Sequence, residues 1–248
     1  MSLRLIINAD DLGRTPEVNH AIARLLSRGL ITSATVIANA PYVEEGVALI
    51  PPPFRDRLGI HLNITEFRPL TGEEVWRGWL AKGGCFSLEN FRQKPLSPQV
   101  KRAIWGEWCA QVARLRSLGL KLSHLDSHHD VHTDPRLLMV LKRLQKHTGL
   151  NKMRLPETLP IRPGALLLKN RLWSWVLRYW PPRARSSQAF ASFVSFWVRG
   201  RQGPLPYHTL EVMVHPGHAN YAEETALLES PWRETLPFPV ELISYQEL

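Results

Sequence analysis

Cysteine is scarce in this chain: only Cys85 and Cys109 occur among its 248 residues, and neither belongs to a CxxC pair. These numbers argue against a disulfide framework and against a cysteine zinc site. No apolar run approaches the length of a membrane span. An N-terminal signal pattern is also missing, because the apolar run that starts at Leu3 is short and leads straight into acids. The expected location is the cytoplasm.

The chain also has no GxGxxG after its first apolar run, no internal repeat and no low-complexity stretch. A dinucleotide-binding fold is therefore not favoured. Hydrophobic residues make up 44% of the chain. This content and length are sufficient for one packed domain, which we expect to span residues 1–248.

Strand-like and helix-like patterns alternate along the chain. Thr15 and Pro16 are typical of a helix start and Gly29 of a stop, and similar signals predict helices over 98–118 and 135–148. Such alternation predicts an α/β fold with a parallel sheet, most simply an irregular (β/α) TIM-type barrel with its chemistry at the carboxyl ends of the strands. The predicted strands are 3–7, 32–38, 58–60, 121–125, 153–155, 210–214 and 240–243.

Two adjacent carboxylates, Asp10 and Asp11, follow the first predicted strand. They would repel each other and lose hydration unless something positive lies between them, and a metal ion is the simplest such partner. Acids also favour helix N-termini, so the helix expected at Pro16 is an alternative explanation. Adjacent strand residues normally point to opposite faces. A shared site therefore requires the chain to turn at this point.

Histidines follow three further predicted strands. His61 ends one, His124 to His132 hold four histidines and two aspartates after another, and His215 follows a late one. If the strands form one barrel, carboxylate and imidazole meet at one rim, which is a common arrangement for a hydrolytic metal site. The alternatives are a capping role for His61, a buried structural role for His124 and a simple turn at His215.

Four stretches carry the polar residues at the predicted strand ends: Asn8–Gly13, Gly59–Asn63, His124–His132 and Glu211–Gly217. Together they resemble the YdjC-like carbohydrate deacetylase family, which includes chito-oligosaccharide deacetylases. They occur in the family's order and span most of the chain. The resemblance implies an irregular (β/α) barrel and a metal-dependent hydrolase that removes acetyl groups from N-acetylated sugars.

The resemblance also implies roles for individual residues. Asp11, His61 and His128 would bind one divalent metal, Asp10 would be the general base, and His215 would protonate the leaving amine. Magnesium is often associated with the family, while zinc suits two imidazoles and a carboxylate at least as well. For contacts with the sugar we expect Asn63, His132 and Arg154.

Two features of the chain depart from the family. Asp130 stands where a third successive histidine is common, and residues 160–206 do not closely resemble the chito-oligosaccharide enzymes. We expect this range to be a helical, Trp/Arg-rich insertion. Three interpretations remain open: packing on the barrel, a lid that stacks on sugar rings, or a membrane-surface helix.

The net charge of +9 comes from 31 basic and 22 acidic residues, and the excess is local. A nucleic-acid partner is not expected, because charges elsewhere are mixed. Residues 165–201 suggest peripheral contact with anionic membrane, which would place the protein at the inner membrane face. A homodimer is left open. The crowded basic residues are Lys169, Arg171, Arg178, Arg183, Arg185, Arg199 and Arg201.

The rival functions are a metal-dependent phosphoesterase, and a non-catalytic protein that binds carbohydrate or a membrane surface.

Overall fold

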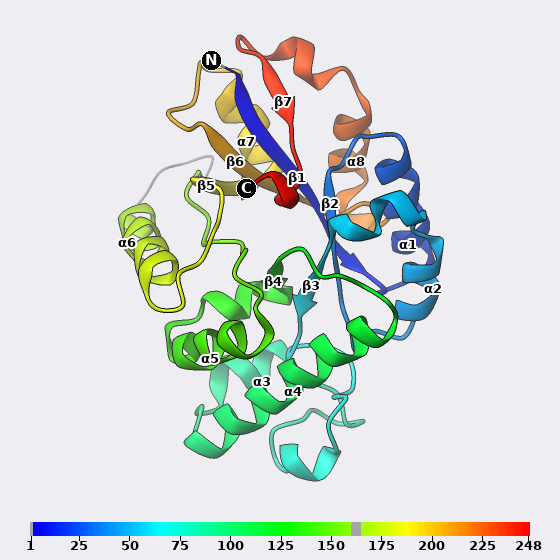
Figure 1. The fold of residues 1–248 in the computed structure, drawn as a ribbon, viewed down its shortest axis with the longest axis vertical. Helices are drawn as coiled ribbons and strands as arrows, with labels where there is room; N and C mark the ends of the chain where they lie inside the picture. Colours follow the sequence, from blue (N-terminus) through cyan, green and yellow to red (C-terminus); the bar gives the residue numbers. More distant parts are fainter. Residues whose placement is uncertain (1, 160–164) are drawn as a thin grey trace.

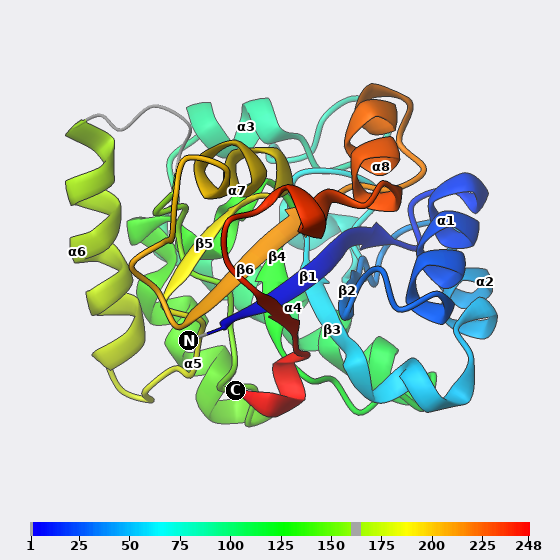
Figure 2. The ribbon, with the colours of Figure 1, turned by 90° about the horizontal axis from the view of Figure 1, so that it is seen from above.

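A computed structural model describes residues 2–159 and 165–248. Seven strands form one parallel sheet in the order β4-β3-β2-β1-β6-β5, and the short β7 pairs with β1 beside this path. The sheet is curled, and because its strands are parallel their carboxyl ends lie along one rim (Figure 2). The strands are β1 (Leu3–Leu12), β2 (Ser33–Val36), β3 (Leu58–Leu62), β4 (Leu125–Ser127), β5 (Ala189–Ser192), β6 (Thr209–Val214) and β7 (Val240–Leu242).

Helices cover the outside of this sheet (Figure 1). α1, α2 and α8 lie on the β1 and β2 side, α3 to α5 lie near β3 and β4, and α6 is the outermost element next to β5. The helices are α1 (Pro16–Ser27), α2 (Val43–Leu49), α3 (Leu88–Gln93), α4 (Pro98–Ser117), α5 (Leu138–Thr148), α6 (Ala165–Tyr179), α7 (Phe193–Gly200) and α8 (Ala222–Glu229).

The parallel α/β fold predicted from the sequence is confirmed. α1 begins where its signals indicate, since Thr15 Oγ1 accepts from the Val18 backbone N–H. The predicted strand at 121–125 is displaced, because β4 begins at Leu125. The stretch 153–155 is not a named strand, although Met153 bridges to Leu125 and Lys152 to Arg185. These isolated bridges lie between β4 and the chain before β5, and a complete TIM barrel is not confirmed.

The predicted helical insertion at 160–206 is likewise not confirmed as one unit. Residues 160–164 lie outside the described residues. The rest contains α6, but also β5, which pairs with β6 inside the sheet, and α7, whose Phe193 and Phe196 are fully buried. Only α6 therefore stands apart from the sheet. Among the described residues, no helix has the length and apolar character needed to cross a bilayer.

Candidate active site

The end of β1 directs Asp10 and Asp11 to different partners. The pairing between β1 and β2 changes register between Ala9 and Leu12. Asp11 has a φ of 73°, in the left-handed region that side chains other than glycine seldom adopt. This irregularity is the turn that a shared site requires, and both carboxylates line one cavity. A local backbone conformation of this kind commonly marks a functional position.

One oxygen of Asp11 lies between two imidazoles. His61 Nε2 is 3.3 Å and His128 Nδ1 is 3.0 Å from Asp11 Oδ1, yet this buried oxygen accepts no hydrogen bond from the described residues. The other oxygen, Oδ2, accepts from His218 Nε2 at 3.1 Å. Buried polar atoms without a partner are rare in folded proteins. An ion bound between the carboxylate and the two ring nitrogens would satisfy all three.

Each of the two imidazoles is held from behind by a carboxylate. Asp126 Oδ1 lies 2.7 Å from His61 Nδ1, and Glu66 Oε2 lies 2.9 Å from His128 Nε2. A carboxylate on the far nitrogen fixes the ring orientation and leaves the near nitrogen free to bind a metal. Arg14 in turn donates to both oxygens of Glu66, at 2.5 and 2.8 Å.

The charges around these groups favour a cation. Burial alone would raise the pKa of Asp11, but His128, His218 and His61 hold it well below its usual range. Burial would lower the pKa of His61, but Asp126 and Asp11 raise it well above its usual value. The pKa of His128 is raised in the same way by Asp11 and Glu66 against the effect of burial. A divalent cation held by these nitrogens would replace their protons.

The residues present therefore fit a single divalent metal. Asp11, His61 and His128 offer one carboxylate oxygen and two imidazole nitrogens, all within 4.8 Å of one another. A second grouping of Asp10, His61 and Asp126 has the same spacing, but both of its carboxylates contact Arg154. Imidazole ligands suit zinc and its neighbours, while magnesium prefers oxygen. The donor set of this chain is thus closer to that of zinc.

Asp10 belongs to a buried network beneath the cavity. Arg154 donates to Asp10 Oδ2 at 2.6 Å and to Oδ1 at 2.7 Å, and it also contacts Asp126 at 3.0 Å and Glu211 at 2.9 Å. Tyr245 donates to the other oxygen of Glu211. We call Asp10, Asp126, Glu211 and Arg154 the acidic floor. Burial raises the pKa of Glu211 to about 7, although Arg154 and Tyr245 oppose this rise. Asp10 and Asp126 share the Arg154 guanidinium, and Asp126 also contacts His61.

The three residues expected to contact sugar are buried outside the cavity lining. Arg154 holds the acidic floor, and His132 lies between Ser127 Oγ and the Arg154 carbonyl. Asn63 shapes the loop after β3, because its Oδ1 accepts from the backbone of Thr65 and Glu66. Their sugar contact stays a prediction that these positions do not support. Each instead holds a group that lines or surrounds the cavity.

His215 reaches the cavity from the end of β6. Its backbone N–H donates to Glu224 Oε1 at 2.6 Å, and its ring stacks on Tyr221 with centroids 4.3 Å apart. Burial would lower its pKa, but Glu224 and the aspartates Asp10 and Asp11 raise it. The following turn packs tightly on α1, since a Cβ at Gly217 would lie 2.6 Å from the Glu17 carbonyl oxygen.

The cavity, of about 370 Å³, brings together four chain segments. Asp10, Asp11, His61, His128 and His215 all line it, as expected from the strand-end pattern. It lies between β1, β3, the turn after β4 and the loop after β6. That turn is strained, because His129 and Asp130 both have positive φ. The other lining residues include Arg14, Ser127, Met213, His218, Asn220 and Tyr221.

Sequence reasoning missed three residues that complete the cluster. Asp126 lies inside a strand and is fully buried. An acid within a strand pattern indicates a buried charge that needs a partner, so the sequence did contain a signal for this residue. His218 was visible only as part of the turn after His215. Glu66 comes from the loop after β3, where nothing in the local sequence distinguishes it from any solvated acid.

Comparisons with known proteins identify the relatives of this chain. The YdjC-like protein family matches residues 4–237. A carbohydrate deacetylase of Geobacillus stearothermophilus is 31% identical over 98% of this chain and 96% of its own. A carbohydrate deacetylase of Vibrio cholerae is 36% identical over 58% of this chain and 56% of its own, so this chain spans about half of that relative.

A solved structure from Enterococcus faecalis, of a protein named for cellobiose-phosphate cleavage, superposes with a TM-score of 0.76. The match covers 100% of this chain and 99% of the other, at 22% identity, and so concerns the fold alone. The family match, in contrast, extends over nearly the whole sequence, and it includes every strand end that lines the cavity. This chain belongs to the YdjC-like protein family.

Proposed function

We propose that this chain is a metal-dependent hydrolase that removes the acetyl group from an N-acetylated sugar. The observation that carries the proposal is the unpartnered Asp11 Oδ1 between two imidazole nitrogens, in a cavity that also exposes a second carboxylate and a third imidazole. Relatives of this chain are named carbohydrate deacetylases. Asp11, His61 and His128 would hold the metal, which when bound polarises the acetamide carbonyl and lowers the pKa of water.

Asp10 is suited to the role of general base. Its bidentate pairing with Arg154 fixes the direction of the carboxylate toward the cavity. A base must lie within reach of the proton that it accepts. Asn8 Nδ2 donates to Asp10 Oδ1 at 2.9 Å, which further restricts the side chain. Asp10 would accept a proton from the attacking water.

His215 is suited to the role of general acid. Its raised pKa favours the protonated imidazole, and the stacked Tyr221 fixes the ring plane. Protonation of the leaving nitrogen is required for a C–N bond to break into acetate and an amine. The two proton carriers come from β1 and β6, which are neighbouring strands. Both residues line the same cavity, so they can act on one acetamide group.

Acetate release from N-acetylglucosamine oligomers, measured with bound metal quantified in the same samples, tests the proposal. Asp11→Ala and His128→Ala should lose both metal and activity, whereas Asp10→Asn should keep the metal and lose about 10²–10⁴-fold in rate. His20→Ala, which changes an exposed histidine on α1, is the matched control. Wild-type activity in Asp11→Ala or His128→Ala would overturn the assignment.

The phosphoesterase alternative calls for two metals about 3.5–4 Å apart. Arg154 already forms ion pairs with Asp10 and Asp126, the carboxylates of the second grouping, and this supports one metal over two. A purely binding protein would need neither the base nor the acid that line the cavity. Release of phosphate from sugar phosphates, without release of acetate, would favour the phosphoesterase.

A further inference from the structure

One segment of this chain carries most of its excess positive charge. Residues 158–210 contain no aspartate or glutamate and eight lysines or arginines, against a net charge of +9 for the whole protein. Surface charges of proteins are normally mixed, so a long acid-free stretch indicates an anionic partner. The segment includes α6, which lies at one edge of the molecule beyond β5 (Figure 2).

α6 exposes a stripe of large apolar side chains. Leu168, Leu172, Trp175 and Tyr179 have 76%, 66%, 61% and 47% of their surface exposed. We call these four residues the apolar stripe. Their spacing of four, three and four residues places them within about 60° of arc on the helix. The next residue, Trp180, is 47% exposed as well.

Basic side chains flank the apolar stripe. At 100° per residue, Lys169 lies on one side of it, and Arg171 and Arg178 lie on the other. The opposite face of α6 is anchored: Trp173 Nε1 donates to the Thr133 carbonyl at 2.6 Å, and Lys142 Nζ donates to the Leu177 carbonyl at 2.6 Å. The stripe is therefore presented outward by a helix that is fixed to the protein, with cations along both of its edges.

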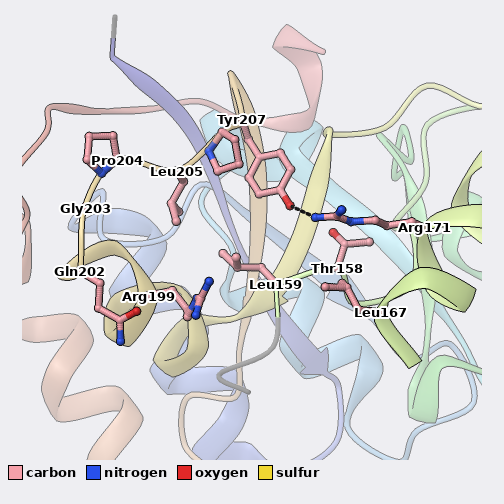
Figure 3. Close-up of a pocket in the computed structure, with 11 residues that line it drawn as sticks. Thr158, Leu159, Leu167, Arg171, Arg199, Gln202, Gly203, Pro204, Leu205 and Tyr207 are labelled. Carbon is pink, nitrogen blue, oxygen red and sulfur yellow. Dashed lines mark hydrogen bonds between the residues drawn. The ribbon is translucent and has the colours of Figure 1, made fainter. Parts of the chain in front are cut away.

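A groove continues from the stripe toward β6. Trp175 and Tyr179 line it together with Arg171 and Arg178, and Arg171 also lines an adjoining cavity of about 260 Å³. In that cavity Arg199 approaches from the side opposite Arg171 (Figure 3). Arg199 Nε is buried with no hydrogen-bond partner, and neither arginine forms an ion pair, among the described residues. Both hollows are thus lined by arginine and lack carboxylates.

We propose that α6 and these arginine-lined hollows dock on the surface of an anionic phospholipid membrane. Exposed Trp, Tyr and Leu on one helix face, bordered by Lys and Arg, match the acyl–headgroup boundary of a bilayer. The unpaired arginines match the phosphate of a headgroup, with which guanidinium groups form paired hydrogen bonds. The absence of any acid across residues 158–210 removes the repulsion that an anionic surface would otherwise meet.

Flotation of the full chain with vesicles tests the docking surface. Vesicles of phosphatidylcholine with phosphatidylserine should bind the protein, pure phosphatidylcholine should bind it weakly, and salt should release it. Lys169→Gln with Arg171→Gln should lower the partition coefficient about tenfold or more. Leu172→Gln with Trp175→Gln should lower it to a similar extent, because the apolar contact is lost.

Matched variants distinguish binding through the docking surface from the non-specific binding of a basic protein to anionic vesicles. Arg102→Gln with Lys121→Gln removes two exposed charges far from α6, and Met139→Gln removes an exposed apolar side chain on α5. Both should bind vesicles as the wild type does. Lipids brominated in their acyl chains should quench the wild-type tryptophan fluorescence more than that of Trp175→Phe.

Three outcomes would overturn the proposal. The first is binding that is equal with neutral and anionic vesicles. The second is a loss in the α6 variants no larger than in the control variants. The third is self-association that Leu172→Gln with Trp175→Gln abolishes while vesicle binding is unchanged, which would assign the stripe to a second copy of this chain. Vesicle binding does not require catalysis, so failure of this proposal and failure of the deacetylase proposal are distinguishable.

Discussion

Charged side chains are buried and paired in the acidic floor, whereas they are exposed on the α6 surface. In the floor, three carboxylates and one arginine are almost fully buried and contact one another. On α6, cations stand exposed beside apolar side chains. Buried charges are costly unless they are paired, while exposed ones cost little. The floor is therefore a fixed structure on which folding depends, and the α6 surface is available for a partner.

The largest expected effect is at the floor. Arg154→Met would leave Asp10, Asp126 and Glu211 buried without their cation, which should lower the free energy of unfolding by about 3–5 kcal/mol. Arg154 also stacks on Phe190, with its guanidinium carbon 4.6 Å from the ring centroid, so methionine retains part of the packing. Urea denaturation followed by circular dichroism measures the change.

Arg178→Met is the matched control for that experiment, since Arg178 lies on α6 and its side chain makes one hydrogen bond with the described residues, to the Ser187 carbonyl. A loss in Arg178→Met equal to that in Arg154→Met would contradict the contrast between the two regions. Partial recovery by combining Arg154→Met with Glu211→Leu would support it, because one of the buried carboxyl groups left without Arg154 is then removed.

Much of the fold and the rim of the site could be predicted from the sequence. Thr15, Pro16 and Gly29 delimit α1 through the residue preferences of helix starts and stops. The expectation that the carboxyl ends of parallel strands share one rim placed five residues in one site: Asp10, Asp11, His61, His128 and His215. The partners of Arg154 could not be predicted, because they come from β1, β4 and β6. Local patterns show that a buried charge needs a partner, but only the fold decides which one. Glu66 and the exposure of α6 depend on tertiary packing in the same way.

A smaller effect is expected where the floor contacts the proposed metal ligand His61. Asp126→Asn should weaken metal binding about 10–100-fold, since Asp126 orients His61 through Nδ1. Titration calorimetry with Zn²⁺ measures this, and Asp56→Asn, an exposed acid, is the control. Unchanged Zn²⁺ affinity in Asp126→Asn would mean that the floor stabilises the fold without affecting metal binding.

The protein should also be sensitive to acid through the buried His124. Burial lowers the pKa of this histidine to about 3, although Asp126 opposes this effect. Its Nε2 lies 3.1 Å from Asn8 Oδ1, and Nδ1 lies 2.7 Å from Ser123 Oγ. The unfolded chain binds this proton near pH 6.5. Stability is therefore present above pH 6.5 and falls by about 1.4 kcal/mol per pH unit as the pH drops toward 3.

His124→Gln should make that slope shallower by about one proton, measured by urea denaturation between pH 7 and pH 5. His20→Gln, an exposed histidine, should leave the slope unchanged. The remaining slope belongs to groups such as His132, whose pKa burial lowers to about 4. An unaltered slope in His124→Gln would show that this histidine is protonated equally in the folded and unfolded states.

The smallest effect is expected on α6. Leu172→Gln should change the free energy of unfolding by less than about 0.5 kcal/mol, because the side chain is 66% exposed. The same substitution at Leu141, fully buried on α5, should cost several times more, since it buries an amide and loses apolar contacts. Urea denaturation of both variants measures the difference. Similar losses would mean that the stripe stabilises the fold, whereas a neutral Leu172→Gln that lowers vesicle binding would leave the stripe with a role only toward a partner.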